Sequence, residues 1–198
     1  MKKLKQQFIS DFSAAMLENN VAVFAGAGLS VPSGYVNWKE LLRQFSDSIG
    51  LDIDKEHDLI SVAQYYKNSA HSKNQITQKL IQEFTKDSKD NNLLTLLTSM
   101  PIGTFWTTNY DHLIEDNLKK SGRRVDVKID NNDLSITPPN IDTTVYKFHG
   151  DISRPYEAVL TRDDYESFDE SHKLFIQTLR GDLISKTFVF VGYSLNDP

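Results

Sequence analysis

The chain has 198 residues, of which 39% are hydrophobic and 25% are charged, and this composition is typical of one folded domain. The formal net charge of -5, without a basic stripe, argues against a nucleic-acid partner. Its apolar runs are shorter than the ~20 residues that a membrane span needs. The absence of cysteine excludes disulfides, thiolate metal sites and a cysteine nucleophile. No apolar segment of a signal peptide follows the basic N-terminus, so we expect a cytoplasmic protein.

Hydrophobic periodicity predicts alternating helices and strands along the chain. Apolar residues at helical spacing predict helices at 4–19, 38–49, 58–86 (two patterns), 91–100, 113–122 and 168–183. Short runs of apolar and β-branched residues predict strands at 21–25, 102–108, 125–129, 143–148 and 187–191. No strand interrupts residues 51–100, which we interpret as a small helical module. The pattern predicts a Rossmann-like α/β fold with a parallel sheet and helices on both faces.

Small or polar residues follow four of the predicted strands. These strand ends are Gly26-Ala27-Gly28, Thr108-Asn109, His149-Gly150 and Gly192-Tyr193-Ser194. In a parallel sheet the carboxyl ends of the strands meet at one edge, where ligands bind. We therefore expect these residues to converge on one crevice.

The first of these segments is a glycine-rich turn followed by Ser30. Glycines there let the main chain approach a pyrophosphate, and a following helix can offer amide N–H groups. The third glycine of a G-x-G-x-x-G motif is replaced by Val31, so a tight strand-to-helix turn is an equal alternative.

The second segment carries an amide at Asn109 and a carboxylate at Asp111. Asn109 can cap the following helix, and Asp111 can favour its positive end. Alternatively, the amide can hold a ribose hydroxyl or a water, and the carboxylate can accept from a carboxamide such as that of nicotinamide.

His149 follows an apolar strand and precedes a glycine, a placement that favours a functional role over a structural one. Imidazole is suited to general-base chemistry at neutral pH. We assign no role to the other histidines, His57, His71, His112 and His172, because no pair has a convincing metal-ligand spacing. No metal is therefore expected.

Together these motifs resemble the sirtuin superfamily. Residues 26–30 resemble its G-A-G-x-S loop for NAD, residues 108–111 its T-Q-N-I-D motif, residues 148–150 the segment with its catalytic histidine, and residues 192–194 its late glycine-x-serine. The chain departs from deacylating sirtuins in lacking a four-cysteine zinc module, and Thr108 replaces their glutamine. Residues 34–38 replace their arginine-bearing segment. The resemblance thus implies the fold without its zinc module.

A closer resemblance, over essentially the whole chain, is to the NAD-hydrolysing effectors of Thoeris antiphage defence systems. The similar segments are 24–30, 34–36, 58–66, 106–108, 173–186 and 196–198. This family implies a homo-oligomer whose C-terminal sensor domain binds a cyclic ADP-ribose-type activator. Since the sequence stops just after an apolar strand, we expect residues 1–198 to be the catalytic domain of a longer chain.

The resemblance implies that NAD is a substrate, cleaved to nicotinamide and ADP-ribose, and that NAD depletion serves abortive infection. It implies that Asn109 and His149 are catalytic. It further implies that NAD is bound by Gly26, Ala27, Gly28, Ser30, Thr108, Asp111, Gly192 and Ser194. Two alternatives remain: an NAD-dependent protein deacylase or ADP-ribosyltransferase, and a non-catalytic NAD or ADP-ribose sensor.

Overall fold

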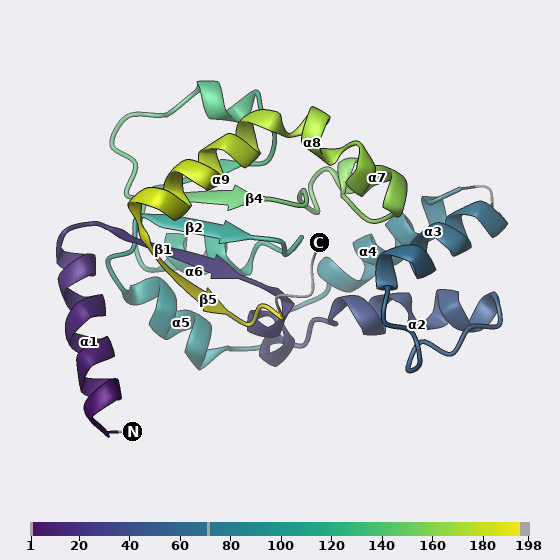
Figure 1. Ribbon diagram of the computed structural model, residues 1–198, viewed down its shortest axis with the longest axis horizontal. Helices are drawn as coiled ribbons and strands as arrows, with labels where there is room; N and C mark the ends of the chain where they lie inside the picture. Colours follow the sequence, from purple (N-terminus) through teal and green to yellow (C-terminus); the bar gives the residue numbers. More distant parts are fainter. Residues whose placement is uncertain (1, 71, 195–198) are drawn as a thin grey trace.

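Five parallel strands form one sheet at the centre of the molecule (Figure 1). The computed structural model describes residues 2–70 and 72–194. The strands are β1 (Val21–Ala25), β2 (Thr104–Thr107), β3 (Val125–Lys128), β4 (Thr143–Lys147) and β5 (Thr187–Val191). They lie in the order β3-β4-β2-β1-β5, and every neighbouring pair is parallel. The predicted Rossmann-like α/β fold is therefore confirmed, with a strand at each predicted position.

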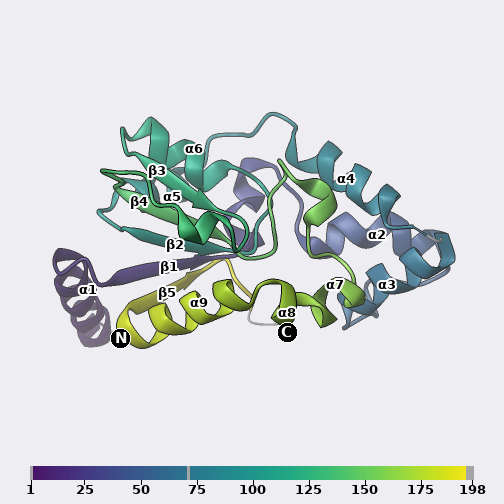
Figure 2. The same ribbon diagram turned by 90° about the horizontal axis from the view of Figure 1, so that it is seen from above.

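Helices cover both faces of the sheet, as Figure 2 shows with the sheet seen close to its edge. One face carries α5 (Asn92–Ser99) and α6 (Leu113–Lys120), and the other carries α9 (Lys173–Ser185). The N-terminal helix α1 (Lys2–Leu17) contacts the first face through Phe12, Ala15 and Met16. Burial of strand side chains on both faces explains why β1 is a continuous apolar run.

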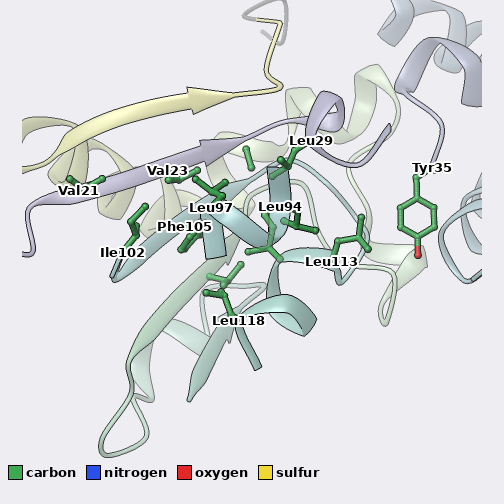
Figure 3. Packing of buried hydrophobic residues seen from close by; sticks show 13 residues of the cluster. Val21, Val23, Leu29, Tyr35, Leu94, Leu97, Ile102, Phe105, Leu113 and Leu118 are labelled. Atoms are coloured by element: carbon green, nitrogen blue, oxygen red, sulfur yellow. The ribbon is translucent and has the colours of Figure 1, made fainter. Parts of the chain in front are cut away.

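The core beneath α5 and α6 is made of aliphatic side chains around Phe105 (Figure 3). Leu94 and Leu97 of α5 and Leu118 of α6 belong to this cluster, and all three are buried. On the opposite face, the buried Trp106 ring stacks on Tyr146 at a centroid distance of 4.1 Å. The two cores fix the sheet between its helical layers, and therefore fix the position of the strand ends.

A separate helical module lies beyond the carboxyl ends of the strands (Figures 1 and 2). It consists of α2 (Trp38–Ser48), α3 (Leu59–Ala70) and α4 (Asn74–Phe84), which share their own apolar cluster. The predicted boundaries of 51–100 were wrong at both ends. The module includes α2, whereas α5 belongs to the sheet because its leucines pack in the core around Phe105.

Two further predictions differ from the structure. No α-helix follows the glycine turn directly; instead two short 3-10 turns, Ala27–Leu29 and Val31–Ser33, lead to Gly34, whose φ is 92°. The single helix predicted at 168–183 is divided into α8 (Phe168–Ser171) and α9, with His172 between them. The apolar spacing continues across His172, which is why periodicity alone did not reveal the break.

Three glycines bring the loops after β1 and β5 into main-chain contact. Gly26 N donates to Val191 O at 3.0 Å, and Gly28 N donates to Gly192 O at 2.8 Å. A Cβ added to Gly26 would lie 2.6 Å from Gly192 O, and one added to Gly192 would lie 2.3 Å from Leu29 N. The glycines therefore allow a close main-chain contact between the loop after β1 and the loop after β5. The predicted approach of the same glycines to a pyrophosphate stays a prediction.

We expect Gly192→Ala to destabilise the fold more than Gly50→Ala. Both glycines have a left-handed backbone, with φ of 64° and 75°, and such a backbone costs an alanine about 1–2 kcal/mol. Around Gly50 a Cβ would meet nothing within 4 Å, whereas at Gly192 it would collide with Leu29 N. Urea denaturation of the two variants measures the difference, and equal losses of unfolding free energy would contradict the close contact.

Candidate functional site

A cleft of about 1140 Å³ lies at the carboxyl ends of the strands, facing the helical module. Its volume exceeds the ~300–1,000 Å³ of common small-molecule sites, so it suits an extended ligand. All of the predicted site residues except Gly26 line it. These lining residues are Ala27, Gly28, Ser30, Thr108, Asn109, Asp111, His149, Gly192 and Ser194. The predicted convergence of the four strand ends is therefore confirmed.

Asn109, Ser30 and Asp111 form a buried hydrogen-bonded chain at the floor of the cleft. The Asn109 amide nitrogen donates to Gly26 O and to Ser30 Oγ, both at 3.0 Å. Ser30 Oγ donates in turn to Asp111 Oδ2 at 2.7 Å. These hydrogen bonds connect the loop after β1 to the loop after β2. Through them Gly26, which does not line the cleft, contacts Asn109, which does.

Asp111, rather than Asn109, accepts from the first turn of α6. Its Oδ1 accepts the main-chain N–H of Leu113 at 3.0 Å, and the Asp111 residue is only 2% exposed. Both of its carboxylate oxygens are thus engaged within the protein. Asn109 does not cap the helix: the N-cap position is His112, whose side chain makes no capping hydrogen bond, and the Asp111 carboxylate lies at the positive end of α6.

One polar atom of this cluster has no partner among the described residues. Asn109 Oδ1 is buried and accepts no hydrogen bond, although its amide nitrogen donates two. A buried acceptor without a partner costs about 1–3 kcal/mol, so such atoms usually meet a ligand or a water. At the cleft floor, this oxygen is available to a hydroxyl group.

His149 lies in an aromatic environment on the opposite side of β2 from the glycine loop. The residue is 6% exposed, and its ring meets those of Tyr165 and Phe168 edge-on at centroid distances of 5.3 and 6.0 Å. Its main-chain carbonyl accepts from Val159 N at 3.0 Å. The aromatic rings restrict the imidazole to a narrow range of orientations while one side of it lines the cleft.

The wall facing the strand ends comes from the helical module and α7 (Arg162–Glu166). Trp38, His57, Asp58 and Tyr165 line this wall, and sequence analysis assigned none of them to the site. These residues lie far from any strand end in the sequence, so no strand-end rule identifies them. Only the packing of the module against α7 brings them to the cleft.

Ion pairs connect the helical module to α7 within the wall that they share. Lys67 Nζ lies 2.7 Å from Asp163 Oδ2, and Lys73 Nζ lies 2.9 Å from Asp164 Oδ1. Hydrogen bonding to Lys73 and to the main chain outweighs the effect of burial and lowers the pKa of Asp164 below its usual range. These contacts hold α7, and with it Tyr165, against the module.

Beneath the cleft lies a buried ionic cluster that sequence analysis also missed. Lys147 is fully buried, and its Nζ lies 3.1 Å from Glu115 Oε1 and 3.3 Å from Asp151 Oδ2. His112 Nε2 lies 2.7 Å from Asp151 Oδ1. One signal was present in the sequence: residues 143, 145 and 147 of a strand share a face, which places a lysine among core residues.

Charge interactions in this cluster shift its pKa values in opposite directions. Burial alone would lower the pKa of Lys147, but the surrounding carboxylates outweigh it and raise that pKa. Burial raises the pKa of Glu115 despite the nearby ammonium. For Asp151, the His112 hydrogen bond and the Lys147 charge outweigh burial and hold the pKa below its usual range.

Within residues 2–70 and 72–194, no group of three or more His, Asp or Glu side chains is arranged to hold a metal ion. In the same part of the chain, no helix combines the length and the apolar character needed to cross a bilayer.

Comparison with known proteins identifies a domain and relatives of the chain. Residues 103–198 match the SIR2-like domain. The chain is 49% identical over 194 residues to the NAD(+) hydrolase ThsA of Cytobacillus dafuensis, covering 98% of this chain and 39% of that protein. Residues 103–198 therefore carry a SIR2-like domain, and nearly the whole chain is similar to that NAD(+) hydrolase.

Two more relatives have the same name. The NAD(+) hydrolase ThsA of Acinetobacter baumannii is 51% identical over 181 residues, which cover 91% of this chain and 38% of that protein. The one from Enterococcus faecium is 47% identical over 196 residues, covering 98% and 41%. The chain therefore spans about two fifths of the length of these curated relatives. The 196–198 segment of the predicted resemblance lies outside the residues described by the structure.

Two histidines of the SIR2-like domain should give its stability opposite pH dependences. The hydrogen bond to Asp151 raises the pKa of His112 above 6.5, whereas burial lowers the pKa of His172. The stabilisation from His112 is therefore full below about pH 6.5 and is lost as pH rises through its folded-state pKa. The stabilisation from His172 is present above about pH 6.5 and is lost as pH falls through the folded-state pKa of His172.

Urea denaturation of His112→Gln and His172→Gln between pH 5 and 8.5 tests this. Relative to wild type, we expect His112→Gln to be most destabilising at the acidic end of the range. His172→Gln should be least destabilising there, because glutamine removes the cost of burying a charged ring. If the loss of unfolding free energy varied with pH in the same way in both variants, the opposite pKa shifts of His112 and His172 would be contradicted.

Proposed function

We propose that this SIR2-like domain hydrolyses NAD to nicotinamide and ADP-ribose, with Asn109 and His149 as its catalytic residues. The observation that carries the proposal is the cleft that brings both side chains together with the glycine loop. Three relatives that are 47–51% identical to this chain are named NAD(+) hydrolases, which supports the same chemistry. NAD enters as the substrate, and the proposed reaction uses no metal.

In the proposed arrangement NAD lies along the strand ends. Gly26, Ala27 and Gly28 contact the pyrophosphate and the neighbouring ribose, since these residues carry no side chain larger than a methyl group where the main chain must approach closely. On the adenosine side, we propose contacts from Gly192 and Ser194.

Ser30, Thr108 and Asp111 complete the proposed binding site. Ser30 and Asp111 are already hydrogen-bonded to each other, so they present a fixed polar surface. In this arrangement Asp111 lies near the nicotinamide carboxamide and acts mainly by orienting Ser30 and Asn109, because both of its oxygens already accept hydrogen bonds.

The proposed reaction breaks the bond between the anomeric carbon and the nicotinamide nitrogen. The bonding electrons return to the positively charged ring, so nicotinamide leaves neutral and needs no protonation. Water adds to the oxocarbenium-like carbon, as in glycoside hydrolysis. Asn109 Oδ1, the buried acceptor without a partner, positions that water or a ribose hydroxyl, and His149 accepts the released proton.

We expect His149→Ala to lower the rate of nicotinamide release by about 10²–10⁴-fold, because it removes a positioned general base. The measurement is chromatographic separation of nicotinamide and ADP-ribose after incubation of the purified chain with NAD. His172→Ala is the matched control, since His172 lies outside the cleft and should retain near wild-type turnover. Near wild-type turnover in a folded His149→Ala variant would remove His149 from the mechanism.

We expect Asn109→Ala to abolish most turnover while NAD binding is largely retained, because the glycine loop remains in place through Gly192. Calorimetry with NAD measures the binding, and chromatography measures the turnover. Asn117→Ala serves as the control for loss of an asparagine, because Asn117 is half-buried on α6 and does not line the cleft. If NAD binding is lost instead, Asn109 is a binding residue and not a catalytic one.

The same assay distinguishes the proposed hydrolase from its alternatives. Nicotinamide release without any peptide supports the hydrolase and contradicts a deacylase or ADP-ribosyltransferase that needs an acceptor. NAD binding without release, in the wild-type chain, is the result expected of a sensor.

We also propose that the domain acts in a cytoplasmic homo-oligomer that depletes NAD in antiphage defence, under a C-terminal sensor for a cyclic ADP-ribose-type activator. The greater length of the relatives is consistent with an additional domain. Mass photometry of the full-length protein, with and without cyclic ADP-ribose isomers, tests the assembly and its response.

A further inference from the structure

The buried ammonium of Lys147 connects the two loops that carry the proposed catalytic residues. Lys147 is the last residue of β4 and lies two positions before His149. Its Nζ donates to the main-chain carbonyl of Asp111, in the loop that follows Asn109. The same ammonium lies 3.3 Å from Asp151, on the other side of His149. One positive charge thus contacts both loops from below.

Lys147 does not reach the substrate side of these loops. The residue is fully buried, whereas Asn109, Asp111 and His149 line the cleft. Lys147 extends instead toward α6, where Glu115 is also buried. Any effect of Lys147 on the reaction must therefore pass through the loops that it contacts.

The cluster is costly as a purely structural element. An ammonium and two carboxylates are removed from water, and neither oxygen of Glu115 makes a hydrogen bond within the described part of the chain. The Lys147 ammonium, 3.1 Å from Glu115 Oε1, is therefore the main compensation of this carboxylate. Apolar residues of similar volume often stabilise a core as well as or better than such a cluster does. What an apolar residue cannot supply is a donor for the carbonyl of Asp111.

We propose that Lys147 is a positioning residue, which holds the loop of Asn109 and Asp111 in register with the loop of His149 through the Asp111 carbonyl. This inference rests on the proposed function. Losing the contact frees the Asp111 peptide to rotate, and with it the hydrogen-bonded chain from Asp111 through Ser30 to Asn109. The glycine loop is held independently by Gly192, so substrate binding depends less on Lys147.

Two variants separate positioning from stability. Lys147→Met removes the ammonium and leaves the buried Glu115 carboxylate uncompensated, while Asp151 keeps its contacts with His112 and the main-chain N–H of Ser153, so the melting temperature should fall. Lys147→Met combined with Glu115→Gln removes the Glu115 charge as well and should recover part of that melting temperature. Both variants still lack the donor to the Asp111 carbonyl.

Lys128→Met is the matched control. Lys128 is a second buried lysine, on the neighbouring strand β3, with Asp126 Oδ2 at 2.7 Å, and it donates to the carbonyls of Asp133 and Ile136. It therefore makes the same kind of contact with a loop that does not line the cleft. Its loss should lower the melting temperature without changing the turnover of the remaining folded protein.

The experiment measures kcat and KM for NAD, with the melting temperature of each variant. We expect kcat to fall about 100-fold in both Lys147 variants, as for a reacting group displaced by about 1 Å, with a much smaller change in KM. Partial recovery of melting temperature in the double variant, without recovery of kcat, supports positioning. Recovery of kcat together with melting temperature, or wild-type kcat in Lys147→Met, would overturn it.

A second readout does not depend on NAD turnover. If the wild-type chain releases no nicotinamide, the proposed function fails, and hydrogen exchange of residues 108–113 then decides the positioning claim. We expect faster exchange there in the double variant than in wild type, with unchanged exchange in α2–α4. Equal exchange at 108–113 in the two proteins would overturn the role of Lys147 in holding this loop.

Discussion

The floor of the cleft depends on one buried carboxylate, that of Asp111. Removing a carboxylate from water is costly unless hydrogen bonds replace those of the solvent. The hydroxyl of Ser30 and the first free N–H of α6 provide them, so the carboxylate determines where a serine from the first loop and a helix from the second must lie. Asn109 is then held by Ser30 and by Gly26 through its amide nitrogen, and its carbonyl oxygen is buried without a partner among the described residues.

This arrangement separates three tasks among neighbouring residues. Main-chain contacts between the glycine loop and Gly192 fix the entrance to the site. The hydrogen bonds from Asp111 through Ser30 to Asn109 fix the Asn109 side chain, and an aromatic environment surrounds that of His149. The ionic cluster beneath β4 connects the loops that carry them.

Much of this could be predicted from the sequence because strand ends in a parallel sheet obey a topological rule. Runs of apolar and β-branched residues identified the five strands of the described sheet, and the residues that follow four of them, from Gly26 to Ser194, meet at one edge. The strand-end rule does not cover the wall formed by the helical module and α7, so it did not identify Trp38 and Tyr165 as cleft residues. It also does not show which atoms of a polar side chain are already engaged: the structure reveals that both carboxylate oxygens of Asp111 accept hydrogen bonds, whereas Asn109 Oδ1 accepts none within the described residues. Lys147 was missed because an isolated lysine at the end of a strand is ordinarily exposed.

The contact between Gly28 and Gly192 has a consequence for the order in which the fold is completed. β1 comes early in the chain, but its neighbour β5 comes last, and β1 lies between β5 and β2 in the sheet. Strand pairings between such distant segments form late, because the entropy cost of closing a long loop precedes the free energy gained from the contacts. During synthesis, one edge of β1 and the glycine loop therefore stay without their partner β5 until residues 187–191 have left the ribosome. The glycine loop, near the start of the chain, takes its final shape only when β5 docks.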